Sequence, residues 1–124
     1  MSQIIVHPGN YVSVQFHWKN VGGAAFAPDF RTAIRSSDPM STWIEGSWIA
    51  AVGVAPGETH IAAAGDQKIP GDWGAGVTID IQLRARVVGS FGETVIQEWL
   101  DVFLIPKVEA DWIEIIEPEL FVKE

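Results

Sequence analysis

The 124-residue chain contains no cysteine. Disulfide bonds, thiolate metal sites and cysteine nucleophiles are therefore excluded, and the fold must be stabilised by packing and hydrogen bonds alone. The three histidines, His7, His17 and His60, lack a second histidine or a carboxylate at the spacing of a metal-binding motif, and no G-x-S-x-G motif is present. We expect a protein that needs no metal or cofactor and is not an enzyme.

Basic residues are also scarce, with 8 Lys and Arg against 16 Asp and Glu, so the formal net charge is −8. Binding to a phosphate backbone requires the opposite sign of charge, so nucleic acid is not an expected partner. No window approaches the run of about 18 apolar residues that a membrane span needs. Residues 1–8 lack the basic and apolar regions of a signal peptide. We expect synthesis in the cytoplasm without a signal peptide, and no membrane partner.

Apolar residues, by contrast, are abundant. They make up 48% of the chain and include six Trp and six Phe, so a single domain with a normal core is expected. Stretches that alternate apolar and polar residues, separated by Gly, Pro and Asn turns, predict strands. The expected strands are residues 3–6, 11–19, 29–36, 43–52 (one or two strands, kinked near Gly46), 59–64, 77–88 and 94–105, with no helix.

The alternation is clearest in residues 11–19 and 77–88. Because side chains on a strand point alternately to its two faces, one face of each segment should be buried and the other solvated. We expect the polar face of residues 77–88 to lie in solvent: Thr78, Asp80, Gln82, Arg84 and Arg86. The expected core includes Val14, Phe16, Trp18, Ile79, Ile81 and Leu83.

Two turns and two strand segments occur in a set order: Lys19-Asn20-Val21-Gly22, residues 30–34, Ala55-Pro56-Gly57-Glu58 and residues 76–81. In this order, over roughly residues 4–88, the chain resembles the immunoglobulin-like domains of bacterial cell-adhesion-related (CARDB-like) proteins. The resemblance implies an all-β fold, an immunoglobulin-like antiparallel β-sandwich of about seven to eight strands. It also implies a non-catalytic spacer, adhesion or assembly module, with no active residues to carry over.

The acidic charge is concentrated near the C-terminus. Residues 93–124 carry 9 acidic and 2 basic side chains, against 7 and 6 in residues 1–92. We expect residues 1–106 to form the sandwich and residues 107–124 to form an acidic C-terminal segment, whose stretch 112–116 is either a further strand or a subunit-contact arm. A solvated acidic surface is the simpler interpretation of the charge itself. The candidate subunit interface is Trp99, Phe103, Trp112, Ile113, Ile115 and Ile116.

The tryptophans are the best lead to function. Trp43, Trp48 and Trp73 fall in or near connections between strands, where a large ring often stays partly exposed. Such rings anchor protein contacts, and exposed coplanar rings also bind sugars. We therefore expect a non-enzymatic structural or interaction module, a subunit of a homo- or hetero-oligomeric assembly such as a phage virion (a decoration, tail or fibre-associated protein). The alternative is a carbohydrate-binding module that holds a glycan on these three rings.

Overall fold

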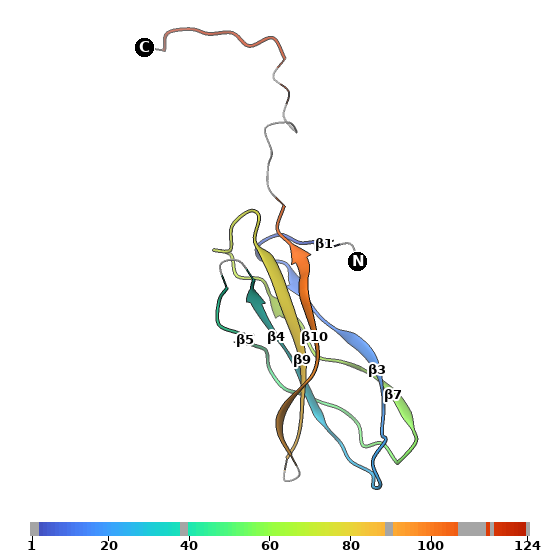
Figure 1. Ribbon diagram of the computed structural model, residues 1–124. Helices are drawn as coiled ribbons and strands as arrows, with labels where there is room; N and C mark the ends of the chain where they lie inside the picture. Colours follow the sequence, from blue (N-terminus) through green and yellow to red (C-terminus); the bar gives the residue numbers. More distant parts are fainter. Residues whose placement is uncertain (1–2, 38–39, 89–90, 107–113, 115, 124) are drawn as a thin grey trace.

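The computed structural model describes residues 3–37, 40–88, 91–106, 114 and 116–123, and among them it contains ten strands and no helix (Figure 1). The expected all-β, sandwich-like fold is confirmed. The strands are β1 (Ile4–Ile5), β2 (Tyr11–Val12), β3 (Gln15–Lys19), β4 (Asp29–Ser36), β5 (Ile44–Glu45), β6 (Ile49–Ala50), β7 (Thr59–Ala63), β8 (Gln67–Lys68), β9 (Thr78–Val87) and β10 (Phe91–Leu104).

The main sheet has the strand order β1-β10-β9-β4-β5, and β6 also pairs with β4. Its centre is formed by the three long strands β10, β9 and β4, which are antiparallel to their neighbours in this group. Strands β4, β9 and β10 coincide closely with the predicted segments, because regular alternation is a local property of the sequence. Strands β5 and β6 lie on either side of Gly46, as the predicted kink requires. Strand β1 runs parallel to β10, with Ile4 opposite Phe103.

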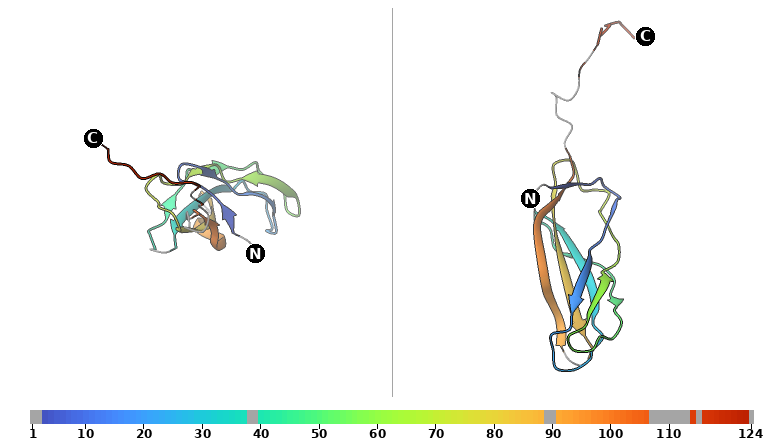
Figure 2. Two further views of the ribbon diagram at one scale, coloured as in Figure 1. Left: turned by 90° about the horizontal axis from the view of Figure 1, so that it is seen from above. Right: turned by 90° about the vertical axis from the view of Figure 1, so that its right-hand side faces the viewer.

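The second layer consists of two short antiparallel pairs, β3 with β7 and β2 with β8, which lie over the main sheet (Figure 2). The predicted single strand 11–19 is wrong, because it divides into β2 and β3. In β3 Gln15 is opposite Ala63, whereas in β2 Val12 is opposite Gln67, so the partner strand contains one extra residue. Gly65 lies in this bulge with φ 83°, a conformation that glycine adopts readily.

The core between the layers forms two clusters. The first comprises Val6, Val12, Ile34, Ile69, Ile79, Ile81, Phe103 and Ile105. The second comprises Phe30, Ala64, Leu83 and Ala85, with Phe16 and Trp18 of β3 packed against it. Ile79, Ile81 and Leu83 are buried as predicted, while Val14, Phe16 and Trp18 are only partly buried, since they belong to the shorter layer.

The outer face of the main sheet differs from the prediction. Asp80, Gln82 and Arg84 do not lie in solvent but are 2%, 7% and 9% exposed. Each is hydrogen-bonded: Arg35 donates to Asp80 at 2.8 Å, and Gln82 donates to Glu98 and accepts from Arg84. Side chains on neighbouring strands and on the segment that carries β5 and β6 cover this face. They provide the hydrogen bonds that water would otherwise make to these polar groups.

The turn after β3 is fixed by a buried asparagine. Asn20 is fully buried, and its side-chain amide donates to the carbonyls of Ala24 and Val54 at 2.9 and 2.7 Å. Its Oδ1 accepts the N–H of Gly22 at 2.8 Å. A buried amide with its partners in place is a rigid connector, so this turn holds the β3–β7 end of the second layer to the segment before β7.

The C-terminal segment contributes no strand within its described part. Glu114 and residues 116–123 are all exposed and have no regular structure. Figures 1 and 2 show residues 116–123 away from the two layers. The strand predicted at residues 112–116 lies mostly outside the described residues.

The core predicts a sharp contrast between two neighbouring isoleucines. Ile34 of β4 is fully buried, while Ile44, its partner on β5, is 39% exposed. Ile34→Ala should lower the free energy of unfolding by roughly 2–5 kcal/mol, because it removes buried methyl groups and leaves a cavity. The same change at Ile44 should cost no more than about 1 kcal/mol. Urea unfolding of both variants measures the difference, and equal losses would contradict the assigned core.

Candidate functional site

The outer face of β4 and β9 carries four arginines. In the β4–β9 register Arg31 lies opposite Arg84, Asp29 opposite Arg86, and Arg35 opposite Asp80. Two like charges directly opposite each other destabilise a strand pair. This face can therefore form only if other groups offset the charge of Arg31 and Arg84.

Two tryptophans from the segment between β4 and β7 stack on these arginines. The guanidinium carbons of Arg31 and Arg86 each lie 4.3 Å from the ring centroid of Trp48. Those of Arg35 and Arg84 lie 4.3 and 5.8 Å from Trp43. Each indole thus contacts two cations, in the geometry of a cation–π interaction. We call these six residues the tryptophan–arginine face.

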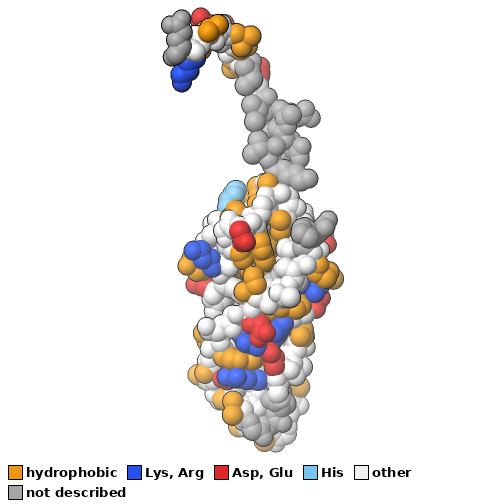
Figure 3. Space-filling model, turned by 90° about the vertical axis from the view of Figure 1, so that its left-hand side faces the viewer, with side chains coloured by type: hydrophobic (Ala, Val, Ile, Leu, Met, Phe, Trp, Pro, Cys, Tyr) orange, Lys and Arg blue, Asp and Glu red, His pale blue; other side chains and the backbone are white. Residues whose placement is uncertain are grey.

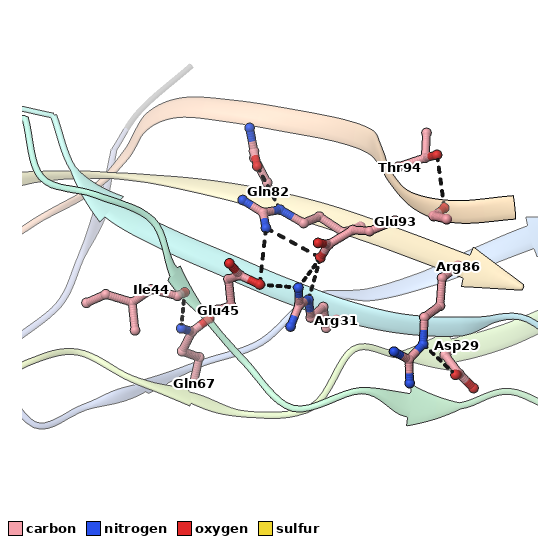
Figure 4. Close-up of polar contacts among 11 residues, drawn as sticks. Asp29, Arg31, Ile44, Glu45, Gln67, Gln82, Arg86, Glu93 and Thr94 are labelled. Carbon is pink, nitrogen blue, oxygen red and sulfur yellow. Dashed lines mark hydrogen bonds and ion pairs between the residues drawn. The ribbon is translucent and has the colours of Figure 1, made fainter. Parts of the chain in front are cut away.

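Carboxylates neutralise the same arginines (Figure 4). Glu45 of β5 and Glu93 of β10 both contact Arg31, and both lie within 4 Å of Arg84, at 3.6 and 3.4 Å. The two outer arginines have their own partners, Asp80 for Arg35 at 2.8 Å and Asp29 for Arg86 at 3.0 Å. Figure 3 shows the resulting mixture of basic and acidic side chains on one side of the sandwich. Because each cation is matched, the face is a poor site for an anionic ligand.

Gly46 brings the two tryptophans onto this face. Its N–H donates to the carbonyl of Thr32 at 2.8 Å, and a Cβ at this position would lie 3.2 Å from the same oxygen. The segment therefore approaches β4 closely at Gly46. Gln67, which accepts from Thr32 at 2.9 Å, donates to the carbonyl of Ile44 and fixes the segment from the other side. Trp43 and Trp48 project from either side of this attachment.

The two neighbouring arginines lower the pKa of Glu93. Burial raises the pKa of its carboxyl, but the hydrogen bonds and positive charges of Arg31 and Arg84 outweigh burial and lower the pKa below the ordinary value of 4.5. The ionised form is therefore the one that the folded protein stabilises. The ion pair between Glu93 and Arg31 therefore connects β10 to β4 across the intervening strand β9.

A groove of about 250 Å³ opens between β6 of the main sheet and β7 of the second layer. One wall is formed by β6 and the residues after it, and the other by β7. Trp18 and Phe30 also line it, with ring centroids 5.7 Å apart. The lining is largely apolar and includes Ile49, Ala50, Ala51, Val52, Ile61, Ala62 and Ala63. This groove was not predicted from the sequence.

A second depression lies beside the end of β10, where the strand has a bulge. Asp101 has φ 51°, and its N–H donates to Oδ1 of Asp80 at 2.8 Å. Thr78 donates to the carboxylate of Asp101 at 3.1 Å, and Gln3 donates to its carbonyl at 3.0 Å. Next to it Leu100 is 60% exposed. These bonds hold the bulge in place and leave Leu100 on the surface.

The predicted interface residues have different positions. Trp99 is partly buried against both core clusters, Phe103 is buried in the first cluster, and Ile116 is exposed. Trp112, Ile113 and Ile115 lie outside the described residues. Exposed apolar side chains that the sequence interpretation did not single out lie along β1 and β10: Ile4, Ile5, Val95, Ile96 and Leu100.

The three predicted platform tryptophans are not equivalent. Trp43 and Trp48 belong to the tryptophan–arginine face, where guanidinium groups lie over their rings. Trp73 instead packs against the first core cluster. The first two are brought together by the fold, and the third contributes to the core.

The part of the chain that the structure describes holds no group of three or more histidines and carboxylates able to bind a metal ion. Within the same residues, no helix is present that could span a bilayer. Comparisons of the chain with protein-family models, with curated proteins and with solved structures found no match. The function must therefore be argued from the geometry.

The charge of Glu93 predicts a specific pH dependence. Because its folded pKa is lowered, its contribution to stability is fully present above the unfolded pKa, near 4.5, and is lost as the pH falls through the folded value. Glu93→Gln should therefore be less stable than wild type at pH 7, and the gap should close between pH 5 and the acid limit of folding. Urea midpoints measured across this range test this.

The control is Glu119→Gln, which changes the net charge equally at an exposed position in the C-terminal segment. Its midpoint should follow wild type at every pH. A gap between Glu93→Gln and wild type that stays constant on acidification would show that the ionised carboxylate is not the stabilising species.

Proposed function

We propose that this protein is a non-enzymatic structural or interaction module that acts as a subunit of a larger protein assembly. The observation that carries the proposal is the exposed apolar C-terminal segment. Ile116, Leu120, Phe121 and Val122 are 76%, 96%, 78% and 90% exposed. Side chains of this kind, gathered in one short segment, are typical of a surface that is covered in a complex.

The body of the protein supports this proposal. The tryptophan–arginine face is stacked, paired and partly buried, which suits a rigid scaffold. The groove beside β7 is lined mainly by aliphatic and aromatic side chains, and His60 is the one titratable residue in its lining. A groove of this composition is suited to apolar contact and offers no acid–base pair for catalysis.

A finer assignment follows from the resemblance over roughly residues 4–88. Immunoglobulin-like modules of the adhesion-related kind serve as spacers and assembly domains. We extend the proposal to a decoration, tail or fibre-associated component of a phage virion, bound to other protein subunits. The net charge of −8 favours protein partners over nucleic acid.

Removal of residues 107–124 tests the role in assembly. The truncated chain should fold, because both core clusters lie within residues 6–105, and it should lose self-association. Circular dichroism and thermal unfolding measure folding, and light scattering at high concentration measures mass. A truncated chain that unfolds, together with a full-length chain that stays monomeric, would make the segment part of the folded domain and contradict the proposal.

A further inference from the structure

The groove beside β7 is bounded by two strands whose outer edges are unpaired. Strand β7 pairs only with β3, and β6 pairs only with β4, among the residues that the structure describes. An exposed strand edge with apolar neighbours readily accepts another strand. The groove is therefore flanked by strand edges from both layers.

The register shows which backbone groups β7 offers. The N–H of Ala64 donates to the carbonyl of Val14 at 3.0 Å, and the N–H of Asn20 donates to the carbonyl of Glu58 at 3.1 Å. The backbone N–H and C=O groups of the even-numbered residues of β7 therefore point toward β3. In an antiparallel pair the backbone groups of the intervening residues point away from the partner strand. The N–H and C=O groups of Thr59, Ile61 and Ala63 are thus directed to the open edge, and Ile61 is 59% exposed.

Trp18, which lines the groove, carries a polar atom without a partner. Nε1 of Trp18 is buried and has no hydrogen-bond partner within the described part of the chain. A buried donor left unpaired destabilises the fold. The unpaired donor shows that the packing around this lining residue is incomplete.

Small side chains create the space. Ala50, Ala51 and Ala62 line the groove, where larger residues would fill it. At Gly65, beyond the end of β7, a Cβ would lie 3.1 Å from the side chain of Ile49, so the backbone passes close to that side chain there. The opening is therefore a consequence of residue size, and it suits medium-sized aliphatic side chains.

The same chain carries a segment that matches this opening. Leu120, Phe121 and Val122 are consecutive, belong to no strand or helix and are more than three-quarters exposed. As a strand they would place Leu120 and Val122 on one face and Phe121 on the other. Leu120 and Val122 would then enter the groove, while Phe121 would lie over Ile61. Pro118, which has no N–H, sets the start of the pairing segment.

The position of the segment favours a neighbouring molecule over its own groove. Strand β10 ends at one end of the sandwich, and β3 and β7 lie toward the opposite end (Figure 1). The chain would have to reverse after Pro106 and run back along the sandwich to reach its own β7. A second copy placed end to end receives it without reversal.

We propose that residues 119–123 of one copy dock in the groove of a second copy, adding as a strand to the free edge of β7. This inference rests on the proposed function of an assembly subunit and names the partner as the chain itself. The contact is head to tail, so it uses different surfaces on the two copies and can repeat into a ring or a filament.

The test uses two full-length variants, Ile61→Lys in the groove wall and Leu120→Asp in the segment. Both positions are exposed in the free chain, so both variants should fold. Each should lose self-association at least about tenfold, because a charge must be desolvated on docking. A 1:1 mixture should form a dimer and nothing larger, because one variant keeps an intact groove and the other an intact segment. Ile5→Lys, at a residue 55% exposed on β1, is the matched control and should assemble like wild type.

Light scattering measures mass, and hydrogen exchange at the amides of Ile61 and Ala63 should show protection that is lost on deleting residues 107–124. If both variants assemble normally while the deletion does not, the segment binds elsewhere: the inference fails and the proposed function stands. A mixture that stays monomeric also overturns the inference. A full-length chain that is monomeric overturns the docking inference too. In that case the proposed function also fails if the truncated chain unfolds, and it stands if the truncated chain folds.

Discussion

The pairing of β4 with β9 places Arg31 directly opposite Arg84, and the rest of the outer face depends on how this repulsion is offset. Glu45 arrives from β5 and Glu93 from β10, and each contacts both arginines. Trp43 and Trp48 then stack on the guanidinium groups and shield them partly from water. Charge compensation thus joins four strands that the hydrophobic core alone would not hold in this arrangement. The short strands β5 and β6 have their place in the sheet because they carry this cover.

The two sides of the sandwich differ in how completely they are closed. On the outer side of the main sheet, indoles and carboxylates cover the arginines. On the side of the second layer, alanines and two unpaired strand edges leave a groove, and an apolar segment remains uncovered at the C-terminus. In the proposed role as an assembly subunit, the closed face would keep the domain rigid and the open parts would make the contacts. The proposed head-to-tail docking would complete both open parts with a single contact.

Local patterns in the sequence predicted the long strands well, since β4, β9 and β10 each alternate within themselves. The division of residues 11–19 could not be predicted, because its cause, the bulge at Gly65, lies in the partner strand. Asp80, Gln82 and Arg84 were assigned to solvent because the pattern of β9 alone contains no information on residues 43–48 and 93–98. Those residues lie elsewhere in the sequence and cover this face. For the same reason Trp43 and Trp48 were recognised as unusual without their arginine partners. The groove depends on small residues, which give no sequence signal.

The parallel pairing of β1 with β10 determines how the domain would carry tension. Ile105 and Pro106 follow β10 directly, so a pull on the chain at this end would be applied to that strand. Strand β10 is bonded to β9 on one side and to β1 on the other, and in both pairs the hydrogen bonds run across the direction of pull. They are therefore loaded together in shear and do not open one at a time as in a zipper. A particle built from such subunits would have its strongest direction along β10.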